Sequence, residues 1–376
     1  MISAAGLREH YSAFLKPGRL LLTGHSHQAW PDAALQGVRD CFDDAARLAD
    51  DKWPAAFAAA DAVRGYVARL LGAQASQIAL APNTHDLLLR FLSSLDLRAR
   101  PHLVTTTGEF HTITRQLRRL EEARALEVTW VEALPVATLA QRLATAITAR
   151  TSAVLASTVL FETSSCVPGL AGLVSHARGL GAEVLLDTYH SFGVVPWDLG
   201  AADAFFVGGG YKYAQWGEGC CFLRVPPRTF RPVITGWFAG FSQLAVKSAG
   251  VAYGPEGAES FAGSTYDPVS HYRARAVIAF FEQQGLTIEV LREISLKQTQ
   301  LLIDGLKSFE LASPREAAQR GGFVALRTPR ASTLVAELRA EGIVTDARGD
   351  LLRLGPAPYL LDDELERAIA VLNRVR

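Results

Sequence analysis

Apolar and polar positions form alternating blocks along the chain from about residue 60 onward. Short apolar runs are typical of buried strands, and stretches in which apolar residues recur every three or four positions are typical of amphipathic helices. The predicted strands of this part of the chain cover residues 78–81, 103–106, 126–131, 153–158, 184–186, 204–207 and 220–225. The predicted helices between them cover residues 63–71, 87–95, 109–122, 136–147 and 170–180.

These apolar runs have no polar alternate face, which predicts a sheet that helices cover on both sides. The alternation of strands and helices further predicts a mostly parallel, doubly wound α/β sheet. Glycine and proline become frequent between Pro226 and Pro268, so we place a domain boundary there. We expect a large domain over residues 61–245 and a smaller C-terminal α+β domain over residues 246–376. The N-terminal segment, residues 1–60, is expected to contribute to the small domain and to the mouth of the functional site.

Composition and charge narrow the class of protein. Hydrophobic residues make up 49% of the chain and charged residues 20%, as in ordinary soluble globular proteins. The 38 lysines and arginines balance the 38 aspartates and glutamates, and without a basic excess we expect no nucleic-acid partner. We find no apolar run long enough to span a bilayer and no secretory signal pattern in residues 1–16. The four cysteines form no Cys-x-x-Cys pair, which favours a reducing compartment. We therefore expect a cytoplasmic protein without a membrane partner.

Residues suited to chemistry concentrate in two segments that each follow an apolar strand. Asp187 follows the strand at 184–186, and His190 lies three residues later; the next apolar strand leads into Gly208–Gly210 and then Lys212. In a parallel α/β sheet the ligand crevice lies beyond the carboxyl ends of the strands, so these side chains are expected at one site. A lysine that forms a Schiff base and a carboxylate that keeps a pyridine nitrogen protonated are the two groups that pyridoxal phosphate (PLP) chemistry requires.

Each of these residues taken alone has a simpler interpretation. An aspartate at a strand end is often a turn or cap residue, and a loop lysine is commonly a solvated surface residue. A run of glycines is usually just a loop, and this one does not match the phosphate-binding Gly-x-Gly-x-x-Gly pattern. The joint order of strand, aspartate, histidine, strand, glycine turn and lysine is what favours a PLP site.

This order resembles the cofactor signature of the class V aminotransferases, a fold-type I PLP-dependent family that includes cysteine desulfurases, isopenicillin-N epimerases and kynureninases. The Tyr211–Tyr213 triplet and the Gly236–Phe238 segment are most similar to kynureninase. The resemblance implies that Lys212 forms the Schiff base with PLP and transfers protons. It further implies that Asp187 binds the pyridinium nitrogen and that His190 supports the ring or its 3′-oxygen.

The same resemblance assigns further residues to the cofactor. Asn83 and Thr84 match the turn that binds the phosphate, and a helix N-terminus suits a phosphate dianion on physical grounds as well. Ordinary helix capping explains these two residues equally well. Phe110 would stack on the PLP ring, although it also fits a plain core position, and Tyr211 would reach the phosphate. One residue of the pair Ser164–Ser165 would also contact the cofactor.

The resemblance extends to the substrate. Arg353, in the segment Leu352–Pro358, matches the arginine that binds the α-carboxylate, and a planar guanidinium suits a bidentate pair with a carboxylate. The simpler alternative is an arginine at the surface of a strand. Trp237 and Thr265 match positions that line the substrate pocket, and the family places its active site at a subunit interface, which implies a homodimer. Gly24–Gln28 and Thr265 depart from the kynureninase pattern, and both departures fall on substrate recognition rather than on cofactor binding.

Three functions follow as hypotheses. The favoured one is a kynureninase-like hydrolysis of a Cβ–Cγ bond in an α-amino acid. The second is transamination, epimerisation or a lyase reaction on the same scaffold; a desulfurase is disfavoured because no cysteine follows Cys221. The third is a catalytically silent binding module, and the retained Asp187, His190 and Lys212 argue against it.

A metal site is the remaining alternative. The spacing of His25 and His27 is known from metal sites, but no carboxylate or cysteine cluster accompanies the pair in the sequence. We therefore predict no metal, and PLP as the cofactor.

Overall fold

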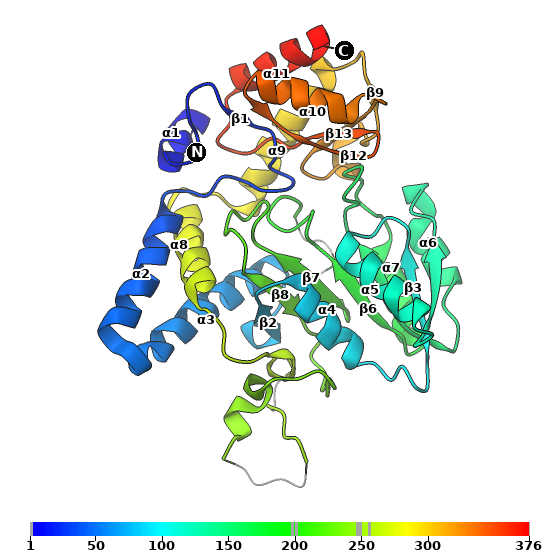
Figure 1. Ribbon diagram of the computed structural model, residues 1–376. Coiled ribbons are helices and arrows are strands. Elements are labelled where there is room, and N and C mark those ends of the chain that lie inside the picture. Colours follow the sequence, from blue (N-terminus) through cyan, green and yellow to red (C-terminus); the bar gives the residue numbers. More distant parts are fainter. Residues whose placement is uncertain (1–2, 197–198, 200–201, 246–249, 255–256, 376) are drawn as a thin grey trace.

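The computed structural model describes residues 3–196, 199, 202–245, 250–254 and 257–375 (Figure 1). Its centre is a seven-stranded sheet in the order β2-β8-β7-β6-β5-β3-β4. The strands are β2 (Ile78–Ala81), β3 (His102–Thr106), β4 (Glu127–Val131), β5 (Thr151–Ser157), β6 (Glu183–Asp187), β7 (Phe205–Gly209) and β8 (Cys221–Arg224). Neighbouring strands from β7 to β4 run parallel, whereas β8 is antiparallel to β7 and β2. The predicted α/β class with a mostly parallel sheet is confirmed.

Helices cover both faces of this sheet. The helices that follow its strands are α4 (Thr84–Ser93), α5 (His111–Glu122), α6 (Leu139–Thr145) and α7 (Leu170–Gly179). Leu186 of β6 belongs to one core cluster with Leu143 of α6 and Leu173 of α7. Leu185, the preceding residue, belongs to a second cluster with Leu87 of α4 and with α5. Because successive side chains of a strand point to opposite faces, both residues must be apolar when both faces are covered.

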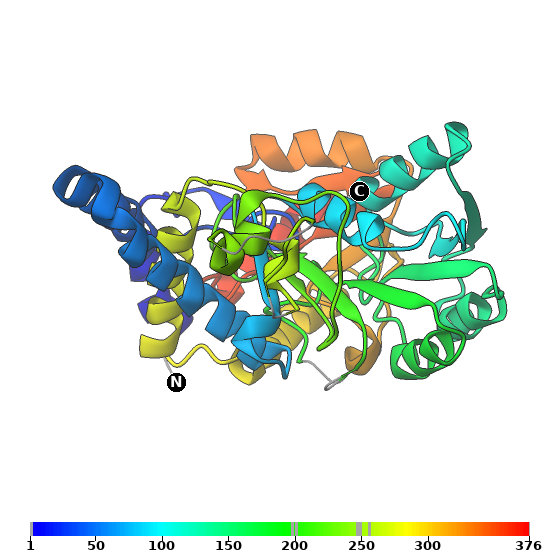
Figure 2. The ribbon, with the colours of Figure 1, turned by 90° about the horizontal axis from the view of Figure 1, so that it is seen from below.

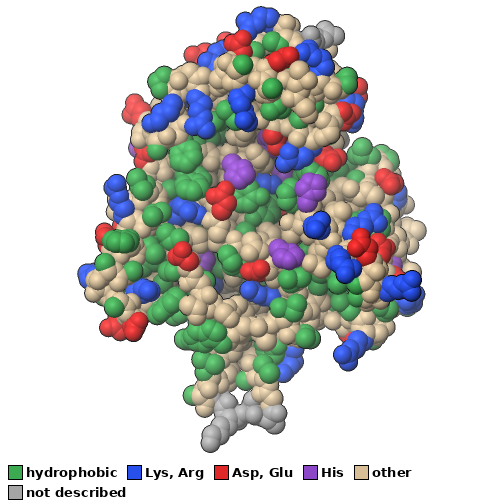
Figure 3. All heavy atoms as spheres, in the orientation of Figure 1, with side chains coloured by type: hydrophobic (Ala, Val, Ile, Leu, Met, Phe, Trp, Pro, Cys, Tyr) green, Lys and Arg blue, Asp and Glu red, His purple; other side chains and the backbone are tan. Residues whose placement is uncertain are grey.

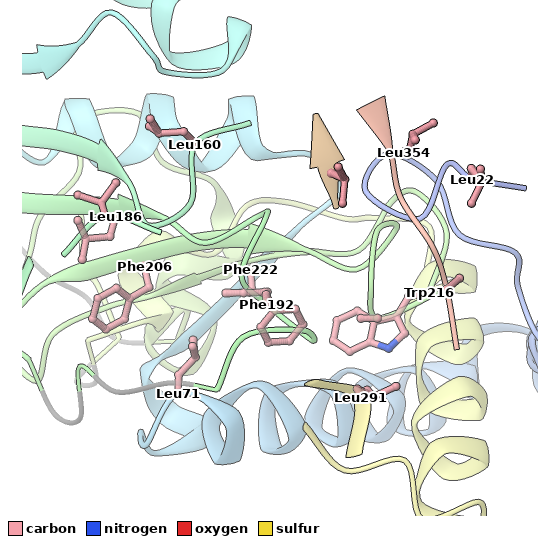
Figure 4. Close-up of a cluster of buried hydrophobic side chains, with 14 of the residues drawn as sticks. Leu22, Leu71, Leu160, Leu186, Phe192, Phe206, Trp216, Phe222, Leu291 and Leu354 are labelled. Carbon is pink, nitrogen blue, oxygen red and sulfur yellow. The ribbon is translucent and has the colours of Figure 1, made fainter. Parts of the chain in front are cut away.

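The first of these clusters continues into the C-terminal part of the chain. Leu186 of the central sheet, Trp216 in the turn region after β7, and Leu354 are members of it (Figure 4). The C-terminal elements are α9 (Ile288–Gly305), β9 (Glu310–Leu311), β10 (Val324–Arg327), α10 (Ala331–Ala340), β11 (Ile343–Val344), β12 (Asp346–Arg348), β13 (Leu351–Leu354) and α11 (Asp362–Val375). Four of these strands form an antiparallel sheet in the order β12-β13-β10-β9.

The N-terminal segment contacts this C-terminal part directly. β1 (Leu20–Leu21) pairs in parallel with β11, and the N–H of Gly24 donates to the carbonyl of Gly355 (2.8 Å). Leu22 is buried in the same core cluster as Leu354 (Figure 4). These contacts bring the Gly24–Gln28 segment beside β13. The predicted domain limits at residues 60 and 245 stay predictions.

The hydrophobic pattern predicts the second half of one long helix near the N-terminus, at residues 63–71, but not the long helix before it. After α1 (Ala4–Arg8), the chain forms α2 (Ala33–Leu48) and α3 (Trp53–Leu70), and α2 packs along α8 (Val269–Gln283). Figure 2 shows α2 and α8 together on the side of the molecule away from α6 and α7. The hydroxyl of Tyr272 in α8 donates to Asp44 in α2 (2.8 Å). None of the described helices is long and apolar enough to cross a membrane.

Candidate active site

A cavity of about 330 Å³ opens where β5, β6 and β7 end. Its volume lies in the range of small-molecule sites, about 300–1,000 Å³, and this edge of a parallel sheet is where ligands bind. Histidine and charged side chains gather on this side of the molecule, between the C-terminal elements and the central sheet (Figure 3). The lining residues are Pro82, Asn83, Thr84, His85, Phe110, Thr112, Ser157, Val159, Phe161, Asp187, Tyr189, His190, Tyr211, Lys212, Glu218, Gly219 and Cys221.

The structure brings Asp187, His190 and Lys212 together as the sequence order predicts. Asp187 is the last residue of β6, and its Oδ1 accepts a hydrogen bond from the backbone N–H of Tyr189 (2.8 Å). Lys212 follows β7, and its Nζ lies 2.6 Å from Nε2 of His190. All three side chains are buried and line the cavity. Parallel pairing of β6 with β7 is what places the two loops side by side.

Burial changes the protonation of these groups. It lowers the pKa of Lys212 to about 7, with the charge of Asp187 opposing the change and that of Arg353 adding to it. Burial and the charge of Lys212 hold the pKa of His190 well below its usual value. Burial raises the pKa of the Asp187 carboxyl, although the N–H of Tyr189 and the charge of Lys212 act against this. Near neutral pH the site thus holds a lysine that can exchange a proton next to a neutral imidazole.

A second buried carboxylate, Glu109, lies behind the cavity wall. Its Oε1 accepts from the Thr106 hydroxyl (2.7 Å) and from the N–H of Ser157 (3.0 Å), and its Oε2 accepts from the Ser157 hydroxyl (2.7 Å). Ser157 ends β5 and is the register partner of Asp187. Burial, with a smaller contribution from Asp187, raises the pKa of Glu109 to about 7, although the Thr106 and Ser157 hydrogen bonds oppose the rise.

Asn83 and Thr84 lie at one end of the cavity, where α4 begins. The side chain of Asn83 caps the helix by accepting from the N–H of Asp86 (2.9 Å), so the capping interpretation holds for this residue. The helix N-terminus still faces the cavity, and its dipole favours an anion there. Tyr211 also lines the cavity, and the ring of His27 stacks on it with centroids 5.0 Å apart.

Aromatic rings surround the lysine. The Nζ of Lys212 lies 5.5 Å from the ring centroid of Phe110, 5.0 Å from that of Tyr189 and 5.8 Å from that of Tyr211. Phe110 occupies the N-cap position of α5 and packs edge-on against Phe161 at 5.5 Å. Aromatic rings favour offset or edge-on contact with another planar ring. The pyridine ring of PLP is planar, so it could make such a contact here.

Arg353 lies behind the cavity wall rather than in it. Its Nη1 donates to the carbonyl oxygen of Phe161 (2.7 Å), a lining residue. Its Nε donates to Oδ1 of Asp346 (3.0 Å) and its Nη2 to Oδ2 of the same carboxylate. The arginine is buried in β13, so the interpretation as a surface residue is wrong.

Trp237 and Thr265 do not lie in the cavity of their own chain. They belong to the described part of residues 225–268, between β8 and α8, which we call the outer lobe and which lies at the bottom of Figure 1. Within this lobe the N–H of Phe238 donates to the carbonyl of Gly263 (3.0 Å). Trp237 exposes 45% of its surface and packs on Phe238 with ring centroids 4.3 Å apart, and Thr265 is exposed. Within one chain, the structure therefore separates these two residues from the other predicted site residues.

The two serines do not line the cavity, whereas the histidine pair lies beside it, where His27 contacts the lining residues Tyr211 and Glu218. Neither Ser164 nor Ser165 lines the cavity. The carbonyl oxygen of Ser164 accepts a hydrogen bond from the N–H of Gly321, and its hydroxyl oxygen accepts one from the N–H of Phe323. His25 is fully buried against Asp346, and His27 is paired with Glu218 (3.1 Å). The described residues contain no group of three histidine, cysteine or acidic side chains that would hold a metal ion.

Several residues at the site were missed by the sequence analysis. Tyr189 stands between Asp187 and His190, so its place in the same loop was a usable signal. Ser157 lies next to the end of the strand predicted at residues 153–158, which is a weaker signal of the same kind. The pattern predicts Glu109 as the first residue of a helix at 109–122, and nothing in the sequence connects it with a strand end 48 positions away.

The fold and these side chains define a PLP-dependent enzyme of fold type I, in the class V aminotransferase group. A family model of the kynureninase C-terminal domain matches residues 291–372. A kynureninase from Deinococcus radiodurans is 31% identical over 331 residues, which cover 84% of this chain and 78% of the relative. A kynureninase from Pseudomonas fluorescens is 26% identical, with 99% of this chain and 92% of the relative covered. The chain belongs to the kynureninase family.

Solved structures agree on the fold at low sequence identity. A C-DES variant with glycine covalently linked to its PLP cofactor superposes with a TM-score of 0.84 at 17% identity, over 97% of this chain and 98% of that chain. A cysteine desulfurase from Escherichia coli has a TM-score of 0.82 at 17% identity, over 100% of this chain and 98% of the other. At such identities the likeness supports the fold-type I architecture alone.

The residues around the cavity fit PLP. Because Nε2 of His190 faces the Nζ donor of Lys212, the neutral ring carries its proton on Nδ1. That Nδ1 is buried and has no hydrogen-bond partner among the described residues. A polar cofactor atom would satisfy this donor, since buried polar groups are nearly always hydrogen-bonded. The start of α4 suits the phosphate, and the buried Asp187 suits the pyridine nitrogen.

Proposed function

We propose that this enzyme hydrolyses the Cβ–Cγ bond of an aromatic α-amino acid of the L-kynurenine type. Water supplies a hydroxyl group to the Cγ carbonyl carbon and a proton to Cβ, so that L-kynurenine and water give anthranilic acid and L-alanine. The observation that carries the proposal is the kynureninase C-terminal domain match, residues 291–372, because it contains Arg353 and its partner Asp346.

We assign each residue of the site a separate role in this reaction. Lys212 would hold PLP, and PLP, when bound, supplies an electron-withdrawing ring for the substrate's α-carbon. The Lys212 amine, with its pKa lowered to about 7, takes the proton from the substrate Cα and returns it. Asp187 carries the charge that keeps the pyridine nitrogen protonated, and Arg353 holds the α-carboxylate.

Thiol chemistry has less support at this site. Cys221 is the cysteine that lines the cavity, and its Sγ lies 3.0 Å from the hydroxyl of Tyr189. Burial raises the pKa of the Cys221 thiol, which disfavours the reactive thiolate. A desulfurase needs such a thiolate in order to accept sulfur from its substrate.

Transamination is the second candidate. A Bacillus subtilis protein named as an uncharacterized aminotransferase is 22% identical, with 93% of this chain and 92% of that protein covered. The segment Gly24–Gln28, which departs from the kynureninase pattern, lies at the C-terminal sheet next to Arg353, and this departure supports a different substrate or reaction. A transaminase would consume a 2-oxo acid and release no anthranilic acid.

We further propose that the active protein is a homodimer. The outer lobe exposes the apolar side chains of Val233, Ile234, Trp237, Phe241, Leu244 and Val251. Exposed apolar patches of this kind mark protein interfaces, and a second copy would cover this one. Trp237 and Thr265 would then line the cavity of the partner subunit. This arrangement would explain why they do not line the cavity of their own chain. Sedimentation velocity that gives a monomer under assay conditions would contradict this proposal.

The test is product analysis with PLP-loaded protein. Hydrolysis predicts equal amounts of anthranilic acid and L-alanine from L-kynurenine, without a 2-oxo acid in the buffer. Turnover of L-kynurenine only when a 2-oxo acid is present, without release of anthranilic acid, would replace hydrolysis by transamination. The Lys212→Ala variant serves as the control for background reaction by free PLP.

A further inference from the structure

The guanidinium of Arg353 is held on one edge by a carboxylate of its own chain. A guanidinium has five N–H donors in a planar fork. Nε and Nη2 both donate to Asp346, which closes the side-on edge, and one N–H of Nη1 donates to Phe161. One N–H on Nη1 and one on Nη2 remain. The number and planarity of these two donors match the two oxygens of one carboxylate.

Asp346 is in turn held by His25. Nε2 of His25 lies 2.8 Å from Oδ1 of Asp346, and its Nδ1 is buried without a hydrogen-bond partner among the described residues. A carboxylate accepts but does not donate, so Nε2 carries the proton and the ring is neutral; a charged ring would leave a second buried N–H donor unpaired. Burial lowers the pKa of His25 to about 4, which agrees with a neutral ring.

The position of the His25 ring is constrained from two further sides. It packs against the ring of Phe323 with centroids 4.7 Å apart, and its Nδ1 lies so close to Gly355 that a Cβ there would come within 2.2 Å. Its side chain has no exposed surface. The ring is therefore packed closely against the residue that directly follows β13, the strand that carries Arg353.

The Asp346 carboxylate has an alternative partner. Its side chain is 22% exposed, and Nη1 of Arg348 lies 3.6 Å from its Oδ2. Without the His25 hydrogen bond, the carboxylate would be free to rotate toward Arg348 and the solvent. Arg353 would then lose one or both of its side-on hydrogen bonds and with them its fixed orientation.

We propose that His25 is a positioning residue for the substrate's α-carboxylate. It holds Asp346 in place, Asp346 holds Arg353 by its side-on edge, and the two outer N–H groups of Arg353 are thereby oriented for the carboxylate. This inference rests on the proposed role of Arg353 in binding that carboxylate. It assigns a function to the segment in which this chain departs from the kynureninase pattern.

The experiment compares two ligands of PLP-loaded protein by titration of the cofactor's visible absorption. L-Alanine carries the carboxylate, and ethylamine is the same molecule without it. In His25→Leu, which keeps bulk and removes the donor, we expect the Kd for L-alanine to rise about tenfold, the value of one hydrogen bond to a charged group. The Kd for ethylamine should stay within about twofold. His25→Gln, whose amide N–H replaces Nε2, should restore most of the L-alanine affinity.

Asp346→Asn gives a second test, because it keeps the side-chain shape and removes the charge that orients Arg353. We expect the same selective loss of L-alanine affinity. Tighter binding of L-alanine in either variant would mean that Asp346 competes with the substrate, and would overturn the proposal. Equal losses for both ligands in His25→Leu would overturn it as well, since they would indicate general disruption of the site.

The failure of the underlying assumption can be recognised separately. If wild-type protein binds L-alanine no better than ethylamine, Arg353 does not recognise the carboxylate, and the proposed function loses its substrate-binding residue. If wild-type protein prefers L-alanine and His25→Leu retains the full preference, Arg353 keeps its role and only the inference about His25 is wrong.

Discussion

The Nζ of Lys212 lies 2.6 Å from Nε2 of His190, although the two residues stand on loops that follow different strands. This contact gives the lysine a neutral hydrogen-bond acceptor instead of a second charge. Its pKa is lowered mainly by burial and kept from falling further by Asp187. The pair thus connects the fold, through the parallel pairing of β6 and β7, with a lysine that can act as a nucleophile and a base near neutral pH.

Replacement of this lysine tests the cofactor linkage. In Lys212→Ala, borohydride reduction should leave no PLP covalently attached to the protein, whereas the wild type should carry one PLP on the peptide that contains Lys212. Activity should fall at least about a hundredfold, because the general base is lost. Mass spectrometry of peptides reads the linkage directly. Full activity and cofactor attachment in the variant would contradict the assignment.

Replacement of Asp187 tests the carboxylate at the end of β6. Asp187→Asn keeps the size of the side chain and removes the charge that would hold the pyridine nitrogen protonated. We expect a loss of activity of at least about a hundredfold, since a buried charge directed at the reacting group is lost. Asp61→Asn is the matched control: Asp61 forms an exposed pair with Arg64, and such pairs contribute little. Comparable losses in both variants would remove the special role of Asp187.

The rate of PLP uptake by cofactor-free protein should depend on pH through Lys212. Only the neutral amine attacks the cofactor's aldehyde, and the pKa of this amine is about 7 instead of 10.5. The rate should rise about tenfold per pH unit below pH 7 and level off above it, as a group with that pKa loses its proton. Stopped-flow absorption gives the profile. A rate that still rises steeply at pH 9 would indicate an ordinary lysine.

Glu109 should make the cofactor-free protein less stable as pH rises. Its pKa is about 7 in the folded state and 4.5 as an ordinary carboxyl, so between these values the folded state binds more protons than the unfolded state. The free energy of unfolding should therefore fall with rising pH in this window, by up to about 3 kcal/mol from this group. Urea unfolding at a series of pH values gives the free energy of unfolding of the wild type and of Glu109→Gln. Plotted against pH, the two free energies should differ in slope only between pH 4.5 and 7. Parallel profiles would refute the prediction.

Cys221→Ser distinguishes hydrolysis from sulfur transfer. The serine hydroxyl can keep the hydrogen bond to Tyr189 but cannot carry sulfur. We expect activity on L-kynurenine to stay within about threefold of the wild type, because the serine hydroxyl replaces the thiol in the hydrogen bond with Tyr189. Loss of most activity in this variant, with the protein still folded by circular dichroism, would give the thiol a chemical role.

The sequence by itself determined the sheet class and the order of the cofactor residues. Apolar strands without a polar face require helices on both sides, and this holds for Leu185 and Leu186. Asp187 and Lys212 each follow an apolar strand, and the carboxyl ends of neighbouring parallel strands meet at one edge of a sheet. Strand apolarity and residue order are local properties, so they can be read without the fold.

Only the tertiary structure decided which distant side chains meet. The reversed direction of β8 follows from its pairing with β2 and β7, which strand hydrophobicity does not specify. His25 and Asp346 are 321 positions apart, and their contact exists because β1 pairs with β11. Trp237 lies on an outer lobe rather than in the cavity of its own chain. Contacts of this kind depend on how whole elements pack, and the side-chain pattern of one segment carries no information about the segment that will face it.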